Sequence, residues 1–188
     1  MFANYPWGIK SFLSFTFISI IVEKYQDSWI VIQTTRCKLS AVQSCDLNLV
    51  IKLYTDTEVR RFLGGVVDEE AIRFRFSQML KPNADRRHWV IRVKENNYPI
   101  GIVSLGKHHN NIDTEISYQL LPESWHKGYG TEAAQAVVTY AIKVMGLPRV
   151  IAETQIVNTA SCRLLERMGM RLERTVERFG AKQGIFTL

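Results

Sequence analysis

The sequence predicts a single domain of mixed α and β structure, of the α+β class. Three observations point to this class. Segments between 88 and 121 read as short strands separated by turn-forming residues, so that neighbouring strands run antiparallel. A loop with two glycines, at 124–131, then leads into a long amphipathic segment. A further strand and helix follow, but the antiparallel strands before the loop disfavour a doubly wound parallel sheet.

Composition and charge narrow the classes of protein to consider. The chain has 188 residues, of which 46% are hydrophobic and 22% are charged, as in one ordinary globular domain with ample material for a core. A net charge of +6 and a pI near 9.3 suit a polyanionic ligand, and also a nucleic-acid surface. The sequence has no long run of like charges, so we do not expect a nucleic-acid-binding tail.

The cysteines and histidines give two further expectations. Cys37, Cys45 and Cys162 show no C-x-x-C spacing, and an odd number without a framework is typical of reduced thiols in a cytoplasmic protein. The adjacent pair His108 and His109 is compatible with a metal site. Because the sequence holds no second Cys/His cluster, we expect a solvated turn there and no metal.

Residues 1–28 differ from the rest of the chain. Within them, 11–22 is an uncharged apolar run, shorter than the roughly 20 residues that a membrane-spanning helix needs. Its length suits a signal sequence, but no small-x-small cleavage site follows. We expect an atypical apolar extension at 1–28, suited to an added strand or an interface, and one domain at 29–188. A membrane anchor is the alternative for the extension.

The first half of the domain is expected to hold a strand and then helices. Residues 29–33 read as a strand, and Asp46 leads a helix with apolar residues at helical spacing. A short helical piece ends at Gly64–Gly65. A third helix starts at Asp68, carries acidic residues in its first turn and stops at Pro82.

The second half is expected to be built mainly of strands around two helices. One helix follows the glycine loop and ends before Gly146, and the other has Asn158 as its N-cap and Gly169 at its end. The expected strands are 88–93, 100–105, 112–121, 149–157 and two short ones joined near Gly180.

The glycine loop has the chemistry of an anion site. Gly128 and Gly130 let the backbone approach a ligand, and the helix that follows offers unpaired N–H groups and the positive end of its dipole. His126 and Lys127 add donors or charge at the same point. Ala133 stands where a G-x-G-x-x-G fingerprint has its third glycine, and no Gly-Lys-Ser/Thr is present. We therefore expect neither a dinucleotide fold nor a nucleoside-triphosphate loop.

Two segments carry a family resemblance. Residues 122–133 and 158–170, in this order and at this distance, resemble the motifs of the GCN5-related N-acetyltransferases, the GNAT superfamily. Residues 55–64 resemble an early segment of the subgroup that contains the ribosomal-protein N-terminal acetyltransferases. The likeness covers about 30–188. Trp125 stands where the family commonly has Gln or Arg.

The resemblance implies a fold and a reaction. The fold is a central, mostly antiparallel, splayed sheet of about six to seven strands with helices on both faces. The donor is acetyl-CoA, which a primary amine attacks directly in a ternary complex. That amine belongs to a protein N-terminus or to a small molecule. We expect the protein to act as a monomer or homodimer. We expect it to bind no metal and no nucleic acid, and not to associate with a membrane.

The resemblance also assigns residues to the cofactor. The pyrophosphate would lie on backbone N–H groups of the loop and the helix start, namely His126, Lys127, Gly128, Tyr129, Gly130 and Thr131. The pantetheine arm would lie between the strands that end near 121 and 157, which splay apart in this family. Backbone amides there would polarise the thioester carbonyl, those of Ser117, Tyr118, Gln119 and Leu120. Asn158 would touch the pantetheine amide as well as cap its helix.

Three side chains are candidates for the acid–base steps. Glu115, on the polar face of its strand, is the candidate base, acting through water; the alternative is a solvent-facing or salt-bridged carboxylate. By resemblance, Ser161 would hydrogen-bond or protonate the leaving sulfur. Tyr118 is a further acid candidate that also suits a core position. We expect Cys162 to be a small buried residue and not an acyl carrier.

The acceptor and the activity itself stay open at this point. A non-catalytic acyl-CoA-binding or sensor domain is the alternative to an enzyme, and the pI keeps a nucleic-acid-binding protein in view. In this family the first helices usually contribute to the acceptor wall. Here that wall would be positively charged and would favour acidic or neutral amines, through Arg60, Arg61, Arg73 and Arg75. The alternative for these arginines is an ordinary basic face exposed to solvent.

Overall fold

The computed structural model describes residues 10–15, 18–25, 29–81, 83 and 85–188. Its helices are η1 (Ser44–Asp46), α1 (Leu47–Thr55), α2 (Thr57–Arg60), α3 (Glu69–Met79), η2 (Pro122–Ser124), α4 (Tyr129–Lys143) and α5 (Thr159–Arg167). Its strands are β1 (Lys10–Phe15), β2 (Ile18–Tyr25), β3 (Trp29–Gln33), β4 (Cys37–Ala41), β5 (Arg86–Val93), β6 (Pro99–Lys107), β7 (Thr114–Leu120), β8 (Ile151–Gln155), β9 (Arg171–Arg178) and β10 (Ala181–Thr187).

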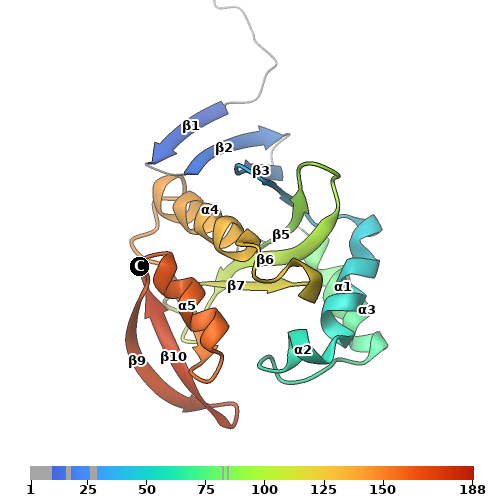
Figure 1. Cartoon of the computed structure of the whole chain (residues 1–188), viewed down its shortest axis with the longest axis vertical. Helices are drawn as coiled ribbons and strands as arrows, with labels where there is room; N and C mark the ends of the chain where they lie inside the picture. The colour runs from blue at the N-terminus through green and yellow to red at the C-terminus, as the bar shows by residue number, and fades with distance from the viewer. Residues whose placement is uncertain (1–9, 16–17, 26–28, 82, 84) are drawn as a thin grey trace, which may run out of the picture.

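One sheet organises the molecule (Figure 1). Across the described residues it has ten strands in the order β1-β2-β3-β4-β5-β6-β7-β8-β10-β9. Every neighbouring pair is antiparallel except β7 and β8, which run parallel. The mixed fold with a mostly antiparallel sheet is confirmed.

The expected count of six to seven strands is too low. The additional strands are β1 and β2, within the N-terminal extension, and β4. The strand β4 was missed because it is only five residues long and contains Ser and Ala, which favour strands weakly. Its buried and exposed residues alternate only at its start, where Cys37 and Leu39 face the core.

Helices pack on both faces of the sheet. On one face, α4 and α5 cover Val103, Leu105 and Ile116. On the other, α1 and α3 cover Val90 and Ile102. Successive strand residues alternate between these two cores because side chains of a strand point to opposite faces. The prediction of helices on both faces is therefore confirmed.

The N-terminal strands extend the edge of the sheet. The strand β1 pairs with β2, and β2 pairs with β3 from Ile21 opposite Gln33 to Tyr25 opposite Trp29. The predicted extension at 1–28 thus includes two strands, while its residues 1–9, 16–17 and 26–28 lie outside the described part. The boundary of the domain at 29 stays a prediction.

Local capping chemistry places the helices near the predicted positions. The side chain of Asp68 accepts a hydrogen bond from the N–H of Ala71, and Asp56 does the same from Val59. Asp46 precedes α1, but its carboxylate accepts from the N–H of Gln43 and pairs with Arg92. The helix α3 ends at Met79, and Pro82, predicted to stop it, lies outside the described residues. Among those residues, no helix has the length and apolar character to cross a bilayer.

Candidate active site

The two parallel strands separate soon after they meet. The strands β7 and β8 pair at a single register, Glu115 opposite Ile151, at the start of both strands. Beyond it, the second half of β7 faces β8 without a ladder. The indole N–H of Trp125 donates to the carbonyl of Leu120 over 2.8 Å, which fixes the end of β7 against the following loop. The splayed geometry that the family resemblance implied is confirmed.

An uncapped helix N-terminus stands at the open end of this gap. Gly128 is the N-cap of α4, with φ 80°, a left-handed conformation that suits glycine. It has no side chain to cap the first-turn N–H groups, which have no partner within the helix. Gly130 lets the helix pack tightly, since a Cβ there would lie 3.1 Å from Leu164 Cδ1. The geometry is that of an anion cradle.

Arg36 adds a cation to this cradle, and the sequence analysis did not identify it. Its Nη1 donates to the carbonyl of Lys127 over 2.8 Å, and its guanidinium lies 4.7 Å from the ring centroid of Tyr129. Its side chain keeps 45% of its surface exposed, so it can still meet a ligand. The residue comes from the turn between β3 and β4, and only the folded sheet brings that turn beside α4.

Glu132, in the first turn of α4, is held away from the cradle by the same turn. Its carboxylate accepts from Thr34 Oγ1 over 2.6 Å and from the Arg36 N–H over 2.7 Å, and it pairs with Arg36 Nε over 2.7 Å. Burial opposes ionisation of Glu132, but these hydrogen bonds and the charge of Arg36 outweigh burial and lower its pKa. The ionised carboxylate is thus satisfied within the protein.

A hydroxyl pair bridges the gap between β7 and α5. Tyr118 Oη lies 2.8 Å from Ser161 Oγ, and Asn158 Oδ1 caps α5 by accepting from the Ser161 N–H over 3.2 Å. Burial raises the pKa of Tyr118 to about 12, although the contact with Ser161 opposes the rise. The phenol therefore keeps its proton at neutral pH. The structure brings together Tyr118, Ser161 and Asn158, as an acid pair would require.

Glu115 lies on the opposite face of β7 from Tyr118, because the two are three residues apart. Burial raises the pKa of its carboxyl group; His108 and Arg86 oppose this rise, and Glu153 adds to it. No described ion pair involves Glu115. A half-buried carboxylate with a raised pKa has the character expected of a general base, but the structure does not bring it into contact with the hydroxyl pair.

A cavity of about 330 Å³ opens on that same face. Its walls come from α1, α3 and the strands β5, β6 and β7, including Ser117, Tyr118 and Gln119 of the predicted set. Gln119 Oε1 is buried and has no hydrogen-bond partner among the described residues. The cavity has the size of a small-molecule site and adjoins the predicted thioester position on β7.

The predicted arginine wall is divided in the structure. Only Arg75 of that set lines the cavity. Arg73 pairs with Glu69 on the outer side of α3, and Arg61 lies over the ring of Phe62. Arg60 is buried and donates to the carbonyl of Gly65 over 2.8 Å. A cavity arginine that the sequence analysis did not include is Arg86, at the start of β5.

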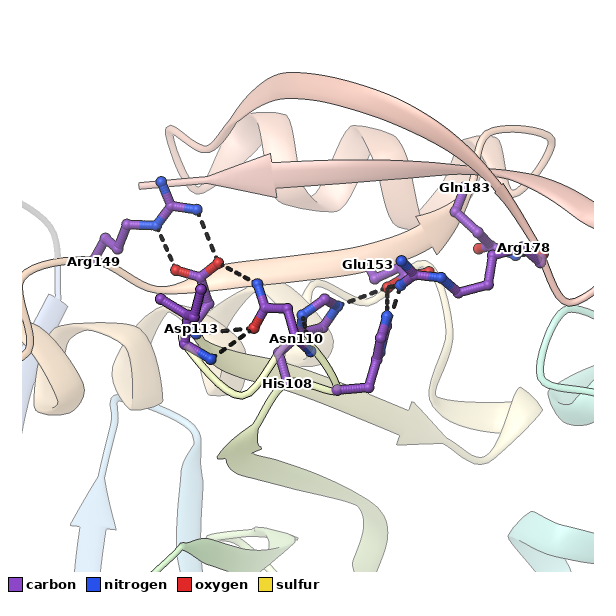
Figure 2. Close-up of polar contacts among 9 residues, drawn as sticks. His108, Asn110, Asp113, Arg149, Glu153, Arg178 and Gln183 are labelled. Atoms are coloured by element: carbon purple, nitrogen blue, oxygen red, sulfur yellow. Dashed lines mark hydrogen bonds and ion pairs between the residues drawn. The ribbon is translucent and has the colours of Figure 1, made fainter.

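The expected solvated turn at His108 is wrong (Figure 2). His108 is only 2% exposed, and its Nε2 lies 2.8 Å from Glu153 Oε2. Arg178 Nη1 donates to the same oxygen over 2.9 Å, and the Asn110 N–H donates to His108 Nδ1 over 3.3 Å. The sequence analysis missed Glu153, which comes from the neighbouring strand β8.

His108, His109 and Glu153 also place one possible metal-ligand atom each within 4.8 Å of one another. The shared carboxylate, however, already faces the cation Arg178. His108 Nδ1 accepts a hydrogen bond from the Asn110 N–H, so the ring hydrogen is on Nε2 and points to Glu153. Both features favour a hydrogen-bonded network that ties the end of β6 to β8 and β9.

Cys162 is a half-buried free thiol that packs against the core. Burial raises its pKa, and its Sγ lies 3.7 Å from the carbonyl of Ile156, to which the thiol donates. A protonated thiol is a poor nucleophile, so the geometry favours the packing role predicted for it.

Known proteins share this architecture. The family model "Acetyltransferase (GNAT) domain" matches residues 36–171. The uncharacterized N-acetyltransferase YnaD of Bacillus subtilis is 30% identical over 143 residues, which span 76% of this chain and 83% of that protein. The crystal structure of a GNAT-family acetyltransferase from Bacillus anthracis matches with a TM-score of 0.74 and 26% identity, over 84% of this chain and 97% of that one.

Two more distant structures share the fold alone. One is a spermidine N-acetyltransferase from Vibrio cholerae in complex with CoA and spermine, with a TM-score of 0.72, 17% identity and coverage of 82% and 95%. The other, from Salmonella typhimurium, modifies the N-terminal serine of ribosomal protein L7/L12, with a TM-score of 0.70, 17% identity and the same coverage, 82% and 95%. The family model covers most of the chain, and the splayed strands and the loop before α4 agree with it. The chain belongs to the GNAT acetyltransferase family.

Proposed function

We propose that this protein is an N-acetyltransferase that transfers the acetyl group of acetyl-CoA directly to a primary amine. The observation that carries the proposal is the hydroxyl pair Tyr118–Ser161, 2.8 Å apart, across the gap between β7 and α5 and beside an uncapped helix N-terminus. An anion cradle and a proton-bearing pair at one gap suit a thioester of a phosphorylated carrier.

The cradle is proposed to bind the pyrophosphate of acetyl-CoA. The first-turn N–H groups of α4, from Gly128 to Thr131, supply donors and the positive end of the helix dipole. Arg36 and Lys127 add positive charge at the same end. Leu120 and Leu164 lie against Gly130, and Asn158, which caps α5, is proposed to contact the pantetheine arm.

The pKa values of the phenol and the leaving thiol decide whether Tyr118 transfers its proton or only donates a hydrogen bond. A pKa of about 12 for the phenol exceeds that of a thiol, about 8.5, by roughly 3.5 units. Full proton transfer would thus cost about 5 kcal/mol. Tyr118 instead donates a hydrogen bond to the sulfur as negative charge develops there, and Ser161 orients the phenol.

The amine side of the reaction is assigned to Glu115. The N–C bond forms as the C–S bond breaks, and the proton that the amine loses passes through water to the Glu115 carboxylate. The raised pKa of Glu115 brings its basicity closer to neutral pH, which suits a general base. Atoms and charge balance when the thiolate later takes that proton.

The acceptor class, compartment and assembly complete the proposal. Fold neighbours act on different amines by their own descriptions, so the fold leaves a protein N-terminus and a small-molecule amine as candidates. Cys37, Cys45 and Cys162 are free thiols, which fits the cytoplasm. The chain is proposed to act as a monomer or homodimer.

The test is amine-dependent release of free thiol from acetyl-CoA, with the acetylated product identified by mass spectrometry. We expect release with at least one primary amine, reduced by Ser161→Ala and by Glu115→Gln with little change in CoA affinity. Thr159→Ala, in the same helix turn and exposed, is the matched control. Binding of acetyl-CoA without transfer to any amine would instead identify a non-catalytic acyl-CoA-binding domain.

A further inference from the structure

The acceptor cavity carries a charge pattern that selects among amines. We infer that it takes a small amine bearing an anionic group, a carboxylate as in an α-amino acid, with Arg75 and Arg86 binding the anion and Gln119 binding the amine. This inference rests on the proposed transferase function and names the substrate class of that site.

Two arginines line the cavity, Arg75 from α3 and Arg86 from β5. Gly106 makes room for Arg86, since a Cβ there would lie 2.8 Å from Arg86 Nε. The guanidinium of Arg75 lies over the ring of Tyr54, 5.7 Å from its centroid. Both side chains are exposed to solvent and rest against these neighbours, and a guanidinium group binds a carboxylate in a bidentate manner.

Arg75 and Arg86 form no ion pair with any described carboxylate, whereas Arg73, two residues before Arg75, pairs with Glu69 over 2.7 Å. None of the described residues that line the cavity is acidic. Burial raises the pKa of the half-buried Glu115 carboxylate and the charge of Arg86 opposes this rise, but Glu115 does not line the cavity. The cavity therefore has an excess of positive charge that a ligand can satisfy.

The histidine in the wall does not add to this charge. Burial, together with the charge of Arg86, lowers the pKa of His88 to about 4, so its ring is neutral at pH 7. Its Nδ1 lies 2.7 Å from Ser104 Oγ. The selectivity is thus assigned to the two arginines alone.

The amine end of the ligand is assigned to Gln119. Its Oε1 is buried and accepts no hydrogen bond from any described residue, although it lines the cavity. An unpaired buried acceptor is costly, and an ammonium or amine N–H removes that cost. Gln119 lies on the same face of β7 as Glu115, so an amine at Gln119 is on the side of the strand that carries the proposed base. A cavity of about 330 Å³ suits a small molecule rather than a folded surface.

The same pattern disfavours a polyamine. A second ammonium group would face two arginines and no lining carboxylate among the described residues. The spermidine acetyltransferase that shares the fold therefore does not supply a model for the acceptor of this chain.

The test compares amines that differ only in charge. L-phenylalanine, L-methionine, L-serine and L-glutamate are each assayed against their α-amides, with O-phosphoethanolamine and spermidine as further acceptors. We expect at least one free acid to exceed its amide by about 10-fold or more in kcat/KM, and spermidine to be the poorest acceptor. A preference for O-phosphoethanolamine over every amino acid would overturn the carboxylate assignment.

Variants of the cavity arginines test which residues cause the preference for a free acid over its amide. Arg75→Gln and Arg86→Gln should each reduce the acid-to-amide ratio by about 10-fold while changing kcat/KM for the amide less than about 3-fold. Arg73→Gln, on the same helix but paired with Glu69, should leave the ratio unchanged. An equal loss for acid and amide in the Arg75 and Arg86 variants would overturn the inference.

A binding readout separates this inference from the transferase function itself. Calorimetric titration of each acid and amide into the protein with CoA present needs no turnover. If thiol release fails but a free acid still binds about 10-fold more tightly than its amide, the transferase function falls and the cavity assignment stands. If no free acid binds better than its amide, the cavity assignment falls, whatever the activity.

Discussion

Replacing Tyr118 by phenylalanine isolates the role of one hydroxyl in the reaction. In the free protein the lost contact is a neutral hydrogen bond to Ser161 Oγ, 2.8 Å away, which contributes about 1 kcal/mol to stability. In the transition state the same hydroxyl would donate to a sulfur that carries negative charge, and such bonds are worth about 1.5–3 kcal/mol. We therefore expect kcat to fall about 10- to 150-fold, with affinity for CoA nearly unchanged.

The assay uses two thioesters that differ in the leaving thiol. With acetyl-CoA the loss should be full, because the alkyl thiolate is basic and needs the hydrogen bond. With an acetyl thioester of an acidic aromatic thiol the loss should shrink toward the 2-fold level, because that thiolate is already stable. Tyr98→Phe, the same change in an exposed loop, is the matched control.

Two outcomes would refute this reasoning. One is a Tyr118→Phe variant whose kcat with acetyl-CoA stays within 2-fold of the wild type. The other is a loss of equal size for both thioesters, which would show that the hydroxyl positions the substrate and does not act on the leaving group.

Three further predictions follow from other charged or buried groups. Burial raises the folded-state pKa of Glu115 above its unfolded value, so the folded state holds its proton more tightly and loses stability as pH rises from about 4.5 through the folded pKa. Glu115→Gln should therefore raise the free energy of unfolding at pH 7, leave it unchanged near pH 4, and lower kcat/KM. Urea unfolding at both pH values measures the stability change. A variant that is less stable than the wild type at pH 7 would contradict the prediction. The pKa of His88 is lowered to about 4, below the unfolded value of about 6.5, so its contribution is complete above pH 6.5 and is lost as pH falls toward 4. This pH-dependent contribution to the free energy of unfolding is about 3 kcal/mol. The difference in stability between wild type and His88→Asn should shrink by about that amount between pH 7 and pH 4. A difference that does not change with pH would refute the burial argument. Arg36→Gln should weaken acetyl-CoA binding by about 5- to 10-fold and cost less than about 1 kcal/mol of stability, because its ion pair with Glu132 is half exposed. Lys38→Gln, an exposed change on the adjoining strand, should do neither, and equal binding by both variants would remove Arg36 from the cradle.

Local signals in the sequence located much of the fold. Asp68 and Asn158 were predicted as helix starts, and each accepts a first-turn N–H in the structure. The turn near Gly180 was also predicted, and it joins β9 to β10 with a positive φ of 71°. These features depend on a few neighbouring residues, so a pattern of residues is enough to find them.

Contacts between distant segments could not be found in this way. Arg36 meets the loop before α4 only because β3 and β4 lie beside that helix in the folded sheet. His108 read as part of a polar turn, but Glu153 of β8 and Arg178 of β9 bury it in a network. The family resemblance named Tyr118 and Ser161 separately, and their contact depends on how β7 and α5 pack.

We propose that the gap between β7 and α5, together with the N-terminus of α4, is an acetyl-CoA site. Calorimetric titration of acetyl-CoA tests it most directly. We expect one site per chain with a Kd between about 1 μM and 1 mM, and at least 10-fold weaker binding by Gly130→Val, whose side chain would crowd Leu164 and Leu120. The unfolding temperature of that variant checks that it is folded. No heat of binding, and no thermal stabilisation by acetyl-CoA at about 1 mM, would contradict the claim.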